Sequence, residues 1–163
     1  MLLSLLGVMM FGSALEVGGL APDFSMPDTD GQSISLSHLV KKGPVVLIFF
    51  PKAFTPGWKK ELTGYRVRYD EFEKVKAQVI AISTDDLATQ KEFKEKLGAD
   101  YAFIADAKGV LTKLYKTKMP LLNIASRKTF VVGQDRKIKA IYSGSEAMDP
   151  GLALGACTLP AKP

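Results

Sequence analysis

One stretch of the sequence decides the fold: Val45-Val46-Leu47-Ile48-Phe49-Phe50-Pro51-Lys52-Ala53-Phe54-Thr55-Pro56-Gly57-Trp58-Lys59-Lys60-Glu61-Leu62. A continuous apolar run ends at Pro51, a short loop with proline and glycine follows, and an amphipathic pattern begins near Trp58. This order predicts a strand buried on both faces, a loop at its carboxyl end and a helix N-terminus. In an open α/β sheet that edge binds ligands, and helix N-termini attract anions. The functional site is therefore expected here, although Trp58 stands where a nucleophile would be placed.

The rest of the chain alternates strands with helices and ends in a hairpin. We predict two short strands within 21–36 joined by an Asp30-Gly31 turn, further strands at 78–83, 101–105, 128–132 and 138–142, and helices over 58–75, from 83–86 to 97 and around 111–115. The tail from about 143 is expected to be irregular, with room for at most a short helix between Asp149-Pro150-Gly151 and Leu159-Pro160. The pattern predicts one α/β domain over residues 15–163, with a central mixed β-sheet flanked by helices.

Composition places the chain among ordinary globular proteins. It has 163 residues, of which 47% are hydrophobic and 24% charged, so one domain with a sizeable core is expected. The net charge of +5 is mildly basic. Basic residues spread over the predicted helix at 58–75 indicate a solvated helix face, and we expect no nucleic-acid partner.

Cysteine and histidine are too scarce for disulfide or metal chemistry. Cys157 is the only cysteine, which excludes an intrachain disulfide, a Cys-x-x-Cys motif and a cysteine zinc site. The single histidine, His38, has no plausible metal-ligand neighbour in the sequence. We expect neither a metal nor a cofactor.

The N-terminus begins with an apolar run from Met1 to Phe11, followed by Gly12-Ser13-Ala14. The run is short for a membrane span but suits the apolar region of a signal peptide before a small-residue cleavage site. Removal of residues 1–14 would leave no membrane span and a periplasmic or secreted protein. Because no Lys or Arg lies in this segment, a misassigned start or an extra packing segment remains the alternative, and the protein would then be cytoplasmic.

The loop from Phe50 to Gly57, followed by Lys59-Lys60-Glu61, resembles the active-site loop of the peroxiredoxins of AhpC/TSA type. The similarity is greatest to the peroxiredoxin Q branch, also called bacterioferritin comigratory protein. That family reads Pro-x-x-x-Thr-x-x-Cys, in which the cysteine reduces the peroxide. This sequence has Pro51 and Thr55, but Trp58 stands at the cysteine position. The resemblance runs from about residue 17 to about residue 143 and implies a thioredoxin-like fold.

The resemblance also assigns roles to residues around Trp58. It implies that Pro51 shields the pocket, that the Thr55 hydroxyl holds the peroxide, and that Arg127 points its guanidinium into the pocket. Glu61 matches the acidic residue one turn into the helix. Taken singly, these would read as loop residues, a salt-bridge partner and a charge at a helix start; together they indicate a peroxidase pocket.

Two departures from the family put its chemistry in doubt. The Trp58 indole has no sulfur and is only a hydrogen-bond donor, so it is expected to fill or cap the pocket and to stack on Arg127 as a cation–π pair. The family's resolving cysteine is also missing, because Thr63 occupies that position. Cys157 would replace it only if the tail folded back over the pocket.

The family activity is thioredoxin-dependent reduction of hydrogen peroxide and alkyl hydroperoxides, an antioxidant function. For this chain we expect an inactive or impaired relative, a pseudoenzyme that binds a partner, a peroxide or a small anion in the Thr55/Arg127 pocket. The alternatives are a residual peroxidase acting through Cys157 and an interaction protein using the basic helix face and the tail. A thioredoxin-like donor is expected only if the chain is active, and the protein is expected to be a monomer or a homodimer.

Overall fold

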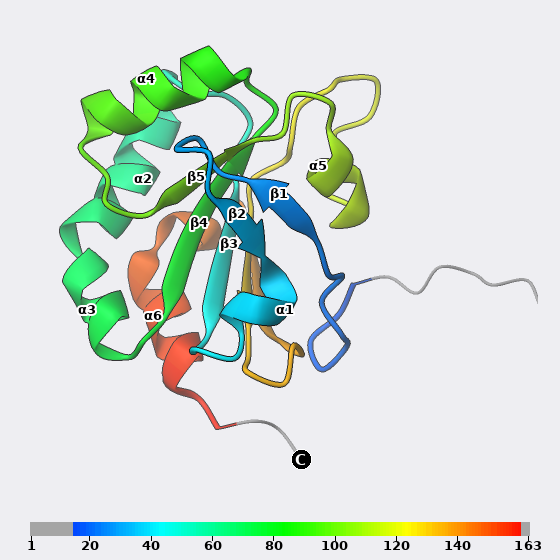
Figure 1. Cartoon of the computed structure of the whole chain (residues 1–163), viewed down its shortest axis with the longest axis vertical. Coiled ribbons are helices and arrows are strands. Elements are labelled where there is room, and N and C mark those ends of the chain that lie inside the picture. Colours follow the sequence, from blue (N-terminus) through cyan, green and yellow to red (C-terminus); the bar gives the residue numbers. More distant parts are fainter. Residues whose placement is uncertain (1–14, 161–163) are drawn as a thin grey trace, which may run out of the picture.

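The computed structural model describes residues 15–160, and Figure 1 shows their arrangement. The strands are β1 (Ser25–Pro27), β2 (Ser33–Ser35), β3 (Val45–Phe49), β4 (Gln78–Ser83), β5 (Ala102–Ala105), β6 (Lys128–Val132) and β7 (Ile138–Ser143). The helices are α1 (Leu36–Leu39), α2 (Pro56–Val67), α3 (Tyr69–Lys74), α4 (Leu87–Leu97), α5 (Val110–Leu114), the short 3₁₀ helix η1 (Glu146–Met148) and α6 (Pro150–Thr158). Within the described part, no helix has the length and apolar character needed to cross a membrane. The signal peptide expected over residues 1–14 lies outside the described residues.

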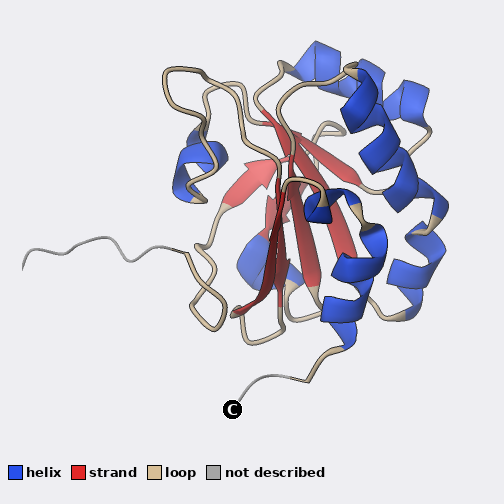
Figure 2. Cartoon of the chain, turned by 180° about the vertical axis from the view of Figure 1, so that it is seen from behind, coloured by secondary structure: helices blue, strands red, loops and turns tan. Residues whose placement is uncertain are grey.

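A five-stranded mixed sheet forms the centre, with the strand order β5-β4-β3-β6-β7. Strands β3, β4 and β5 run parallel, whereas β6 is antiparallel to both β3 and β7. Helices α2, α3, α4 and α6 cover one face, and the β1–β2 hairpin, α1 and α5 cover the other (Figures 1 and 2). The predicted mixed sheet flanked by helices is confirmed.

Strand β3 is apolar throughout because it is buried on both faces. Alternate side chains of a strand point to opposite faces, so Val46 and Ile48 enter the core beneath α2, while Leu47 and Phe49 enter the core beneath the hairpin and α5. A strand with only one buried face would show alternating polar residues instead. Because β3 is buried on both faces, it lies in the middle of the sheet. Its carboxyl end therefore lies among the ends of the neighbouring strands.

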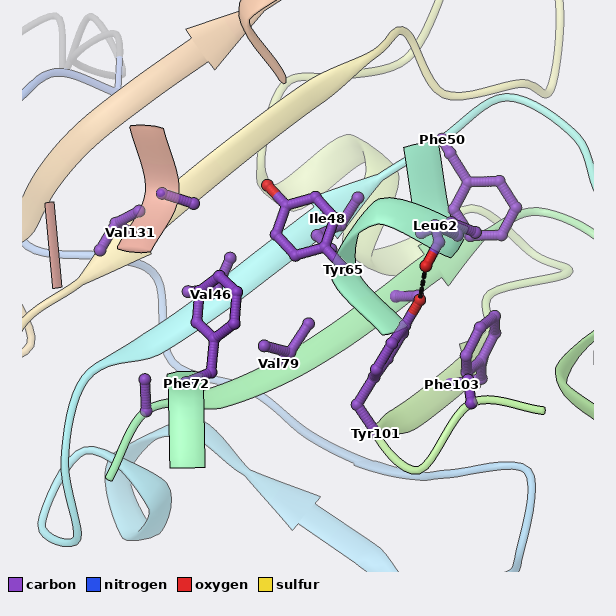
Figure 3. Close-up of a cluster of buried hydrophobic side chains, with 14 of the residues drawn as sticks. Val46, Ile48, Phe50, Leu62, Tyr65, Phe72, Val79, Tyr101, Phe103 and Val131 are labelled. Carbon is purple, nitrogen blue, oxygen red and sulfur yellow. Dashed lines mark hydrogen bonds between the residues drawn. The ribbon is translucent and has the colours of Figure 1, made fainter. Parts of the chain in front are cut away.

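The core beneath α2 is rich in aromatic rings (Figure 3). Tyr65 stacks on Phe72 with ring centroids 5.6 Å apart. The hydroxyl of Tyr101 donates a hydrogen bond of 2.7 Å to the Leu62 carbonyl, which ties β5 to α2. Buried tyrosine hydroxyls usually find such a partner, and this bond links the start of β5 to α2.

The helix predicted over 58–75 is two helices in the structure. It begins at Pro56, is interrupted at Arg68 and continues as α3. The guanidinium of Arg68 pairs with Glu71, with Nε to Oε2 at 2.6 Å, and it also lies against the first turn of α6 at Gly151. The chain bends where α6 packs on it, a tertiary contact that helix periodicity does not reveal.

The tail is more regular than we expected. Residues 146–148 form η1 and residues 150–158 form α6, a helix of nine residues. The Asp149 side chain caps it by accepting from the Gly151 N–H at 2.8 Å, and Pro150 occupies the first turn. The tail is ordered because Ala153, Ala156 and Cys157 are buried against the sheet. Helix α6 lies where the sequence left room for a short helix, between Asp149-Pro150-Gly151 and Leu159-Pro160, and η1 was not expected.

Candidate active site

Strand register brings Arg127 to the carboxyl end of β3. Phe49, the last residue of β3, lies opposite Lys128 at the start of the antiparallel strand β6. Arg127 precedes Lys128, so it lies beside the chain segment where Phe50 and Pro51 leave the sheet. The parallel strand β4 ends at the same edge. Residues far apart in the sequence thus meet at one site, as the switch from parallel to antiparallel pairing favours.

The loop after Pro51 is held by Asp85, which follows β4. One carboxylate oxygen of Asp85 accepts from the Ala53 N–H at 2.8 Å and from the Ser83 hydroxyl at 2.7 Å. Phe54 adopts a left-handed backbone, with φ of 63°, and its ring packs against Phe93 of α4 at 5.2 Å. A left-handed aromatic residue is strained, and such strain persists only where surrounding contacts fix it. The loop is therefore a defined structure.

Helix α2 begins at this loop with its first turn uncapped by a side chain. Thr55 is the N-cap residue, but its hydroxyl donates to the Lys52 carbonyl at 3.1 Å and makes no capping bond. Pro56 has no N–H, and Gly57 brings the backbone close to Arg127: a Cβ there would lie 3.4 Å from the Arg127 Nη2 atom. The positive end of the helix and a guanidinium thus lie close together.

Trp58 covers the guanidinium of Arg127. The Arg127 Cζ atom lies 3.6 Å from the centroid of the Trp58 ring, which confirms the predicted stacking. A cation on an indole face at this distance gains about 0.5–2 kcal/mol, depending on how far it is desolvated. The aromatic face is the main counterpart of the guanidinium here, because its contact with Glu61 is long, at 3.5 Å from Nε to Oε2.

Glu61 is buried beneath the stack without a hydrogen bond. Its side chain is fully buried, and neither carboxyl oxygen has a hydrogen-bond partner within the described residues. Burial raises the pKa of Glu61 to about 8, because the loss of hydration outweighs the attraction of Arg127. The carboxyl is thus mostly protonated at neutral pH. We give Trp58, Glu61 and Arg127, together with the preceding loop that carries Pro51 and Thr55, the name Trp58 site.

The two residues considered as thiol positions lie outside this arrangement. Thr63 is half-buried on α2 and supplies no sulfur. Cys157 is on α6, only 6% exposed, within the core beneath α2 and α6. Burial raises the pKa of its thiol to about 11 against the weaker opposing effect of Lys139. The tail does fold back onto α2, β6 and β7, but it buries the thiol in the core.

Two of the surface hollows among the described residues lie away from the Trp58 site, and no residue of that site lines either of them. One of about 390 Å³ lies by Lys42, Tyr69 and Gln78, and one of about 420 Å³ lies by Thr29, Leu87 and Lys91. Between residues 15 and 160 no group of His, Cys, Asp and Glu side chains is arranged to hold a metal ion.

Comparison with protein families identifies the group to which this arrangement belongs. The model of the AhpC/TSA family matches residues 17–141, which include β3, the loop, α2 and Arg127. The chain belongs to the AhpC/TSA family. The matched range agrees closely with the one inferred from the loop motif, and the family resemblance predicted from Pro51, Thr55 and their neighbours is confirmed.

Relatives of this AhpC/TSA protein carry peroxiredoxin names. A putative peroxiredoxin of Mycobacterium tuberculosis is 38% identical over 138 residues, covering 83% of this chain and 90% of the relative. The chloroplastic peroxiredoxin Q of Oryza sativa subsp. japonica is 35% identical over 127 residues, covering 77% of this chain and 58% of that protein. Similarity to the peroxiredoxin Q branch is thereby confirmed.

Solved structures confirm the thioredoxin-like fold. The crystal structure of peroxidoxin BcpB from Mycobacterium tuberculosis has a TM-score of 0.81 and 36% identity, covering 88% of this chain and 96% of the other. The bacterioferritin comigratory protein of Xanthomonas campestris has a TM-score of 0.76 and covers 88% of this chain and 95% of the other. At 21% identity the second comparison supports the fold alone.

Sequence reasoning placed Trp58, Glu61 and Arg127 together, and the structure brings them into contact. It missed Asp85, which fixes the loop of the Trp58 site. The available signal was its position directly after a strand parallel to β3, since the carboxyl ends of parallel strands meet at one edge. Phe54 was also missed, because backbone strain has no signature in the residue type.

Proposed function

We propose that this AhpC/TSA protein does not reduce peroxides by the cysteine mechanism of its family. The supporting observation is the Trp58 ring lying on Arg127 at 3.6 Å, in the place that the resemblance gives to the peroxidatic thiolate. In the family reaction, the thiolate attacks one peroxide oxygen, the O–O bond breaks, and the cysteine becomes a sulfenic acid while an alcohol or water leaves. An indole has no sulfur to accept that oxygen. Cys157 is a poor substitute, because a buried thiol of raised pKa contains little thiolate.

A thioredoxin-like donor is consequently not expected to act on the native protein. Its role in the family is to return an oxidised cysteine to the thiol, and neither Trp58 nor Thr63 forms such a product. We propose a monomeric or homodimeric pseudoenzyme over residues 15–163 that keeps the frame of the pocket.

The test is peroxide consumption by the chain, by Trp58→Cys and by Cys157→Ser, with hydrogen peroxide and with an alkyl hydroperoxide. Dithiothreitol serves as reductant alongside a thioredoxin system, because Trp58→Cys still lacks a cysteine at Thr63. We expect the chain and Cys157→Ser to be inactive and Trp58→Cys to turn over, since the helix N-terminus and Arg127 would stabilise a thiolate. Activity in the parent that Cys157→Ser abolishes would show that the tail thiol does the chemistry.

Binding of a small anion at the Trp58 site is the second candidate function. Its support is the first turn of α2, which has no side-chain cap, together with Arg127, whose Nε atom is buried without a hydrogen bond. Trp58 is the only tryptophan, so its fluorescence reports directly on the stack. Inorganic phosphate or acetate should alter the emission in the parent and not in Arg127→Gln. An emission that stays constant in both proteins would mean that neither anion binds beside the Trp58–Arg127 stack.

We also propose that residues 1–14 direct export and are removed after Ala14. The support is the apolar run followed by small residues. N-terminal sequencing of the protein recovered from cells gives Leu15 as the first residue if this is right, and Met1 if the segment stays attached.

A further inference from the structure

The loop between α5 and β6 exposes a cluster of large apolar side chains. Leu121 is 103% exposed, Leu122 50% and Met119 38%, and we name these three residues the apolar tip. The loop projects from the sheet end at which β3 and β4 also finish, in yellow at the upper right of Figure 1, and it projects in the reverse view as well (Figure 2). Single exposed leucines are ordinary on protein surfaces, but three large apolar residues close together on one projecting loop are typical of an interaction site.

The fold holds the apolar tip outward in a defined conformation. The Met119 N–H donates to the Ile124 carbonyl at 2.9 Å, and Lys118 pairs with Ala125, which closes the loop at its base. Leu121 has a left-handed φ of 61°, an arrangement that side-chain-bearing residues rarely adopt. Leu121 thus combines a strained backbone conformation with a fully exposed side chain.

Hydrogen bonds to the rest of the molecule fix the loop further. The Thr84 hydroxyl donates to the Asn123 carbonyl at 2.6 Å, and the Asn123 amide donates to the Ala107 carbonyl at 3.0 Å. At Gly109 a Cβ would lie 2.6 Å from the Asn123 oxygen, so the base of the loop packs tightly against the start of α5. These contacts set the base of the tip beside Lys108.

The chain segment that carries the tip is basic in sequence, whereas Thr84, bonded to Asn123, brings the acidic Asp85 and Asp86 to the base of the tip. Residues 107–134 contain five lysines and one arginine and no Asp or Glu, whereas the net charge of the whole chain is +5. The positive charge of the protein is thus concentrated in this segment. Lys108, Lys113 and Lys118 are exposed close to the tip in the sequence, and we name them the basic collar. Helix α5 adds the exposed side chains of Val110 and Leu114 to the apolar surface.

We propose that the apolar tip and the basic collar form a docking surface for an anionic lipid bilayer. Apolar side chains on a projecting loop fit insertion among lipid headgroups, and exposed lysines in the same chain segment fit the negative charge of the headgroups. A second copy of this chain is a poorer occupant, because like collars repel when the same surface faces itself. The basic face of α2 is different, since Asp70, Glu71 and Glu73 of the adjoining α3 accompany its lysines, and no projecting apolar cluster accompanies it.

The experiment is co-sedimentation of the full chain with vesicles of phosphatidylcholine, with and without phosphatidylglycerol. The variant Leu121→Glu/Leu122→Glu removes the tip, and Lys108→Gln/Lys118→Gln removes two collar charges. Val67→Glu is the matched control, because Val67 is an exposed apolar residue, 65% accessible, at the end of α2. All proteins keep residues 1–14, so any binding by that apolar segment is common to them.

We expect binding to vesicles that contain phosphatidylglycerol. Salt should weaken this binding, and binding should be at least tenfold weaker without the anionic lipid. The tip variant should lose at least tenfold in binding and the collar variant on the order of fivefold per lysine, whereas the binding of Val67→Glu should be unchanged.

An unchanged affinity in the tip variant would overturn the proposal, provided that its unfolding midpoint matches that of the parent. If neither vesicle type binds, the proposal fails, and an acidic protein surface becomes the remaining charge-complementary occupant. A dimer that the tip variant abolishes, without any vesicle binding, would assign the surface to self-association and equally overturn it.

Discussion

At the scale of residues, the Trp58 site holds a cation against an aromatic face. The Arg127 guanidinium lies on the Trp58 ring, with Cζ 3.6 Å from the ring centroid. The aromatic face offsets part of the cost of burying the cation. Glu61 is buried nearby, but the distance of 3.5 Å between its Oε2 atom and the Arg127 Nε atom is too long for an ion pair with good geometry. The site therefore contains an ionisable carboxyl, that of Glu61, and the surrounding fold does not stabilise its charged form.

The pH dependence of stability should report that carboxyl directly. The pKa of Glu61 is raised from 4.5 to about 8 in the folded protein, so the folded state binds its proton more tightly than the unfolded state. Its contribution to stability is fully present below pH 4.5 and is lost progressively as the pH rises to 8, at a cost of about 3–5 kcal/mol. Glu61→Gln imitates the protonated carboxyl, so it should remove this loss. Urea unfolding at pH 5 and pH 8.5 measures the difference.

The buried tyrosines and the thiol do not titrate between those pH values in the folded protein. Burial raises the pKa of Tyr65, Tyr101 and Tyr115 above 10, and it raises that of Cys157 to about 11. The expectation is therefore that Glu61→Gln is more stable than the parent at pH 8.5 and similar at pH 5. An equal fall in both proteins would show that Arg127 stabilises the ionised carboxylate after all.

The sequence allows a contact to be predicted when the contact follows from the type of side chain. It does not allow one to be predicted when the contact depends on the exact distance between two elements. The stacking of Arg127 on Trp58 was predictable because an indole at that position leaves a neighbouring cation few other partners. The absence of hydrogen bonds at Glu61 was not, because it depends on the separation of α2 from Arg127.

At the scale of elements, local signals set most boundaries. The apolar run of β4 occupies 78–83 as predicted, and α4 ends at Leu97 because Gly98 supplies a left-handed residue, with φ of 67°. The start of α4 lies later than Ser83: Asp86 is the cap and accepts from the Thr89 N–H at 2.8 Å. Helix α6 was harder to recognise, because its glycine- and alanine-rich sequence has no polar face from which to read a helical period.

The loop after β3 should depend on one carboxylate from the neighbouring strand. Asp85→Ala removes the acceptor of the Ala53 N–H and of the Ser83 hydroxyl, at a cost of about 1–3 kcal/mol. The amide of Ala53 should then lose its protection from hydrogen exchange. Asp86→Ala is the matched control, since it removes the cap of α4 at a cost of about 1 kcal/mol and leaves the loop bonds intact. If Ala53 stays protected in Asp85→Ala, the loop is held by the packing of Phe54 on Phe93 instead.

At the scale of the whole molecule, the last helix, α6, covers part of one face of the sheet and carries the only thiol of the chain. Helix α6 packs on β6, β7 and α2, and so contributes to the core that also positions Trp58. Exposure of Cys157 requires at least the detachment of α6. The rate at which Cys157 reacts with a thiol reagent thus measures how often α6 detaches. A slow rate indicates a structural cysteine, and a fast rate would indicate a cysteine accessible for catalysis.

Labelling with a maleimide should accordingly be slow in the native protein and fast when it unfolds. Cys157 is buried and its pKa is raised to about 11, so both accessibility and thiolate content are low. The matched control is Cys157→Ser/Thr158→Cys, because Thr158 is exposed at the next position on the same helix. We expect the control to react at least a hundredfold faster in buffer and at the same rate as the parent in denaturant. Equal rates in buffer would mean that α6 opens readily, and the tail thiol would then be available for chemistry at the Trp58 site.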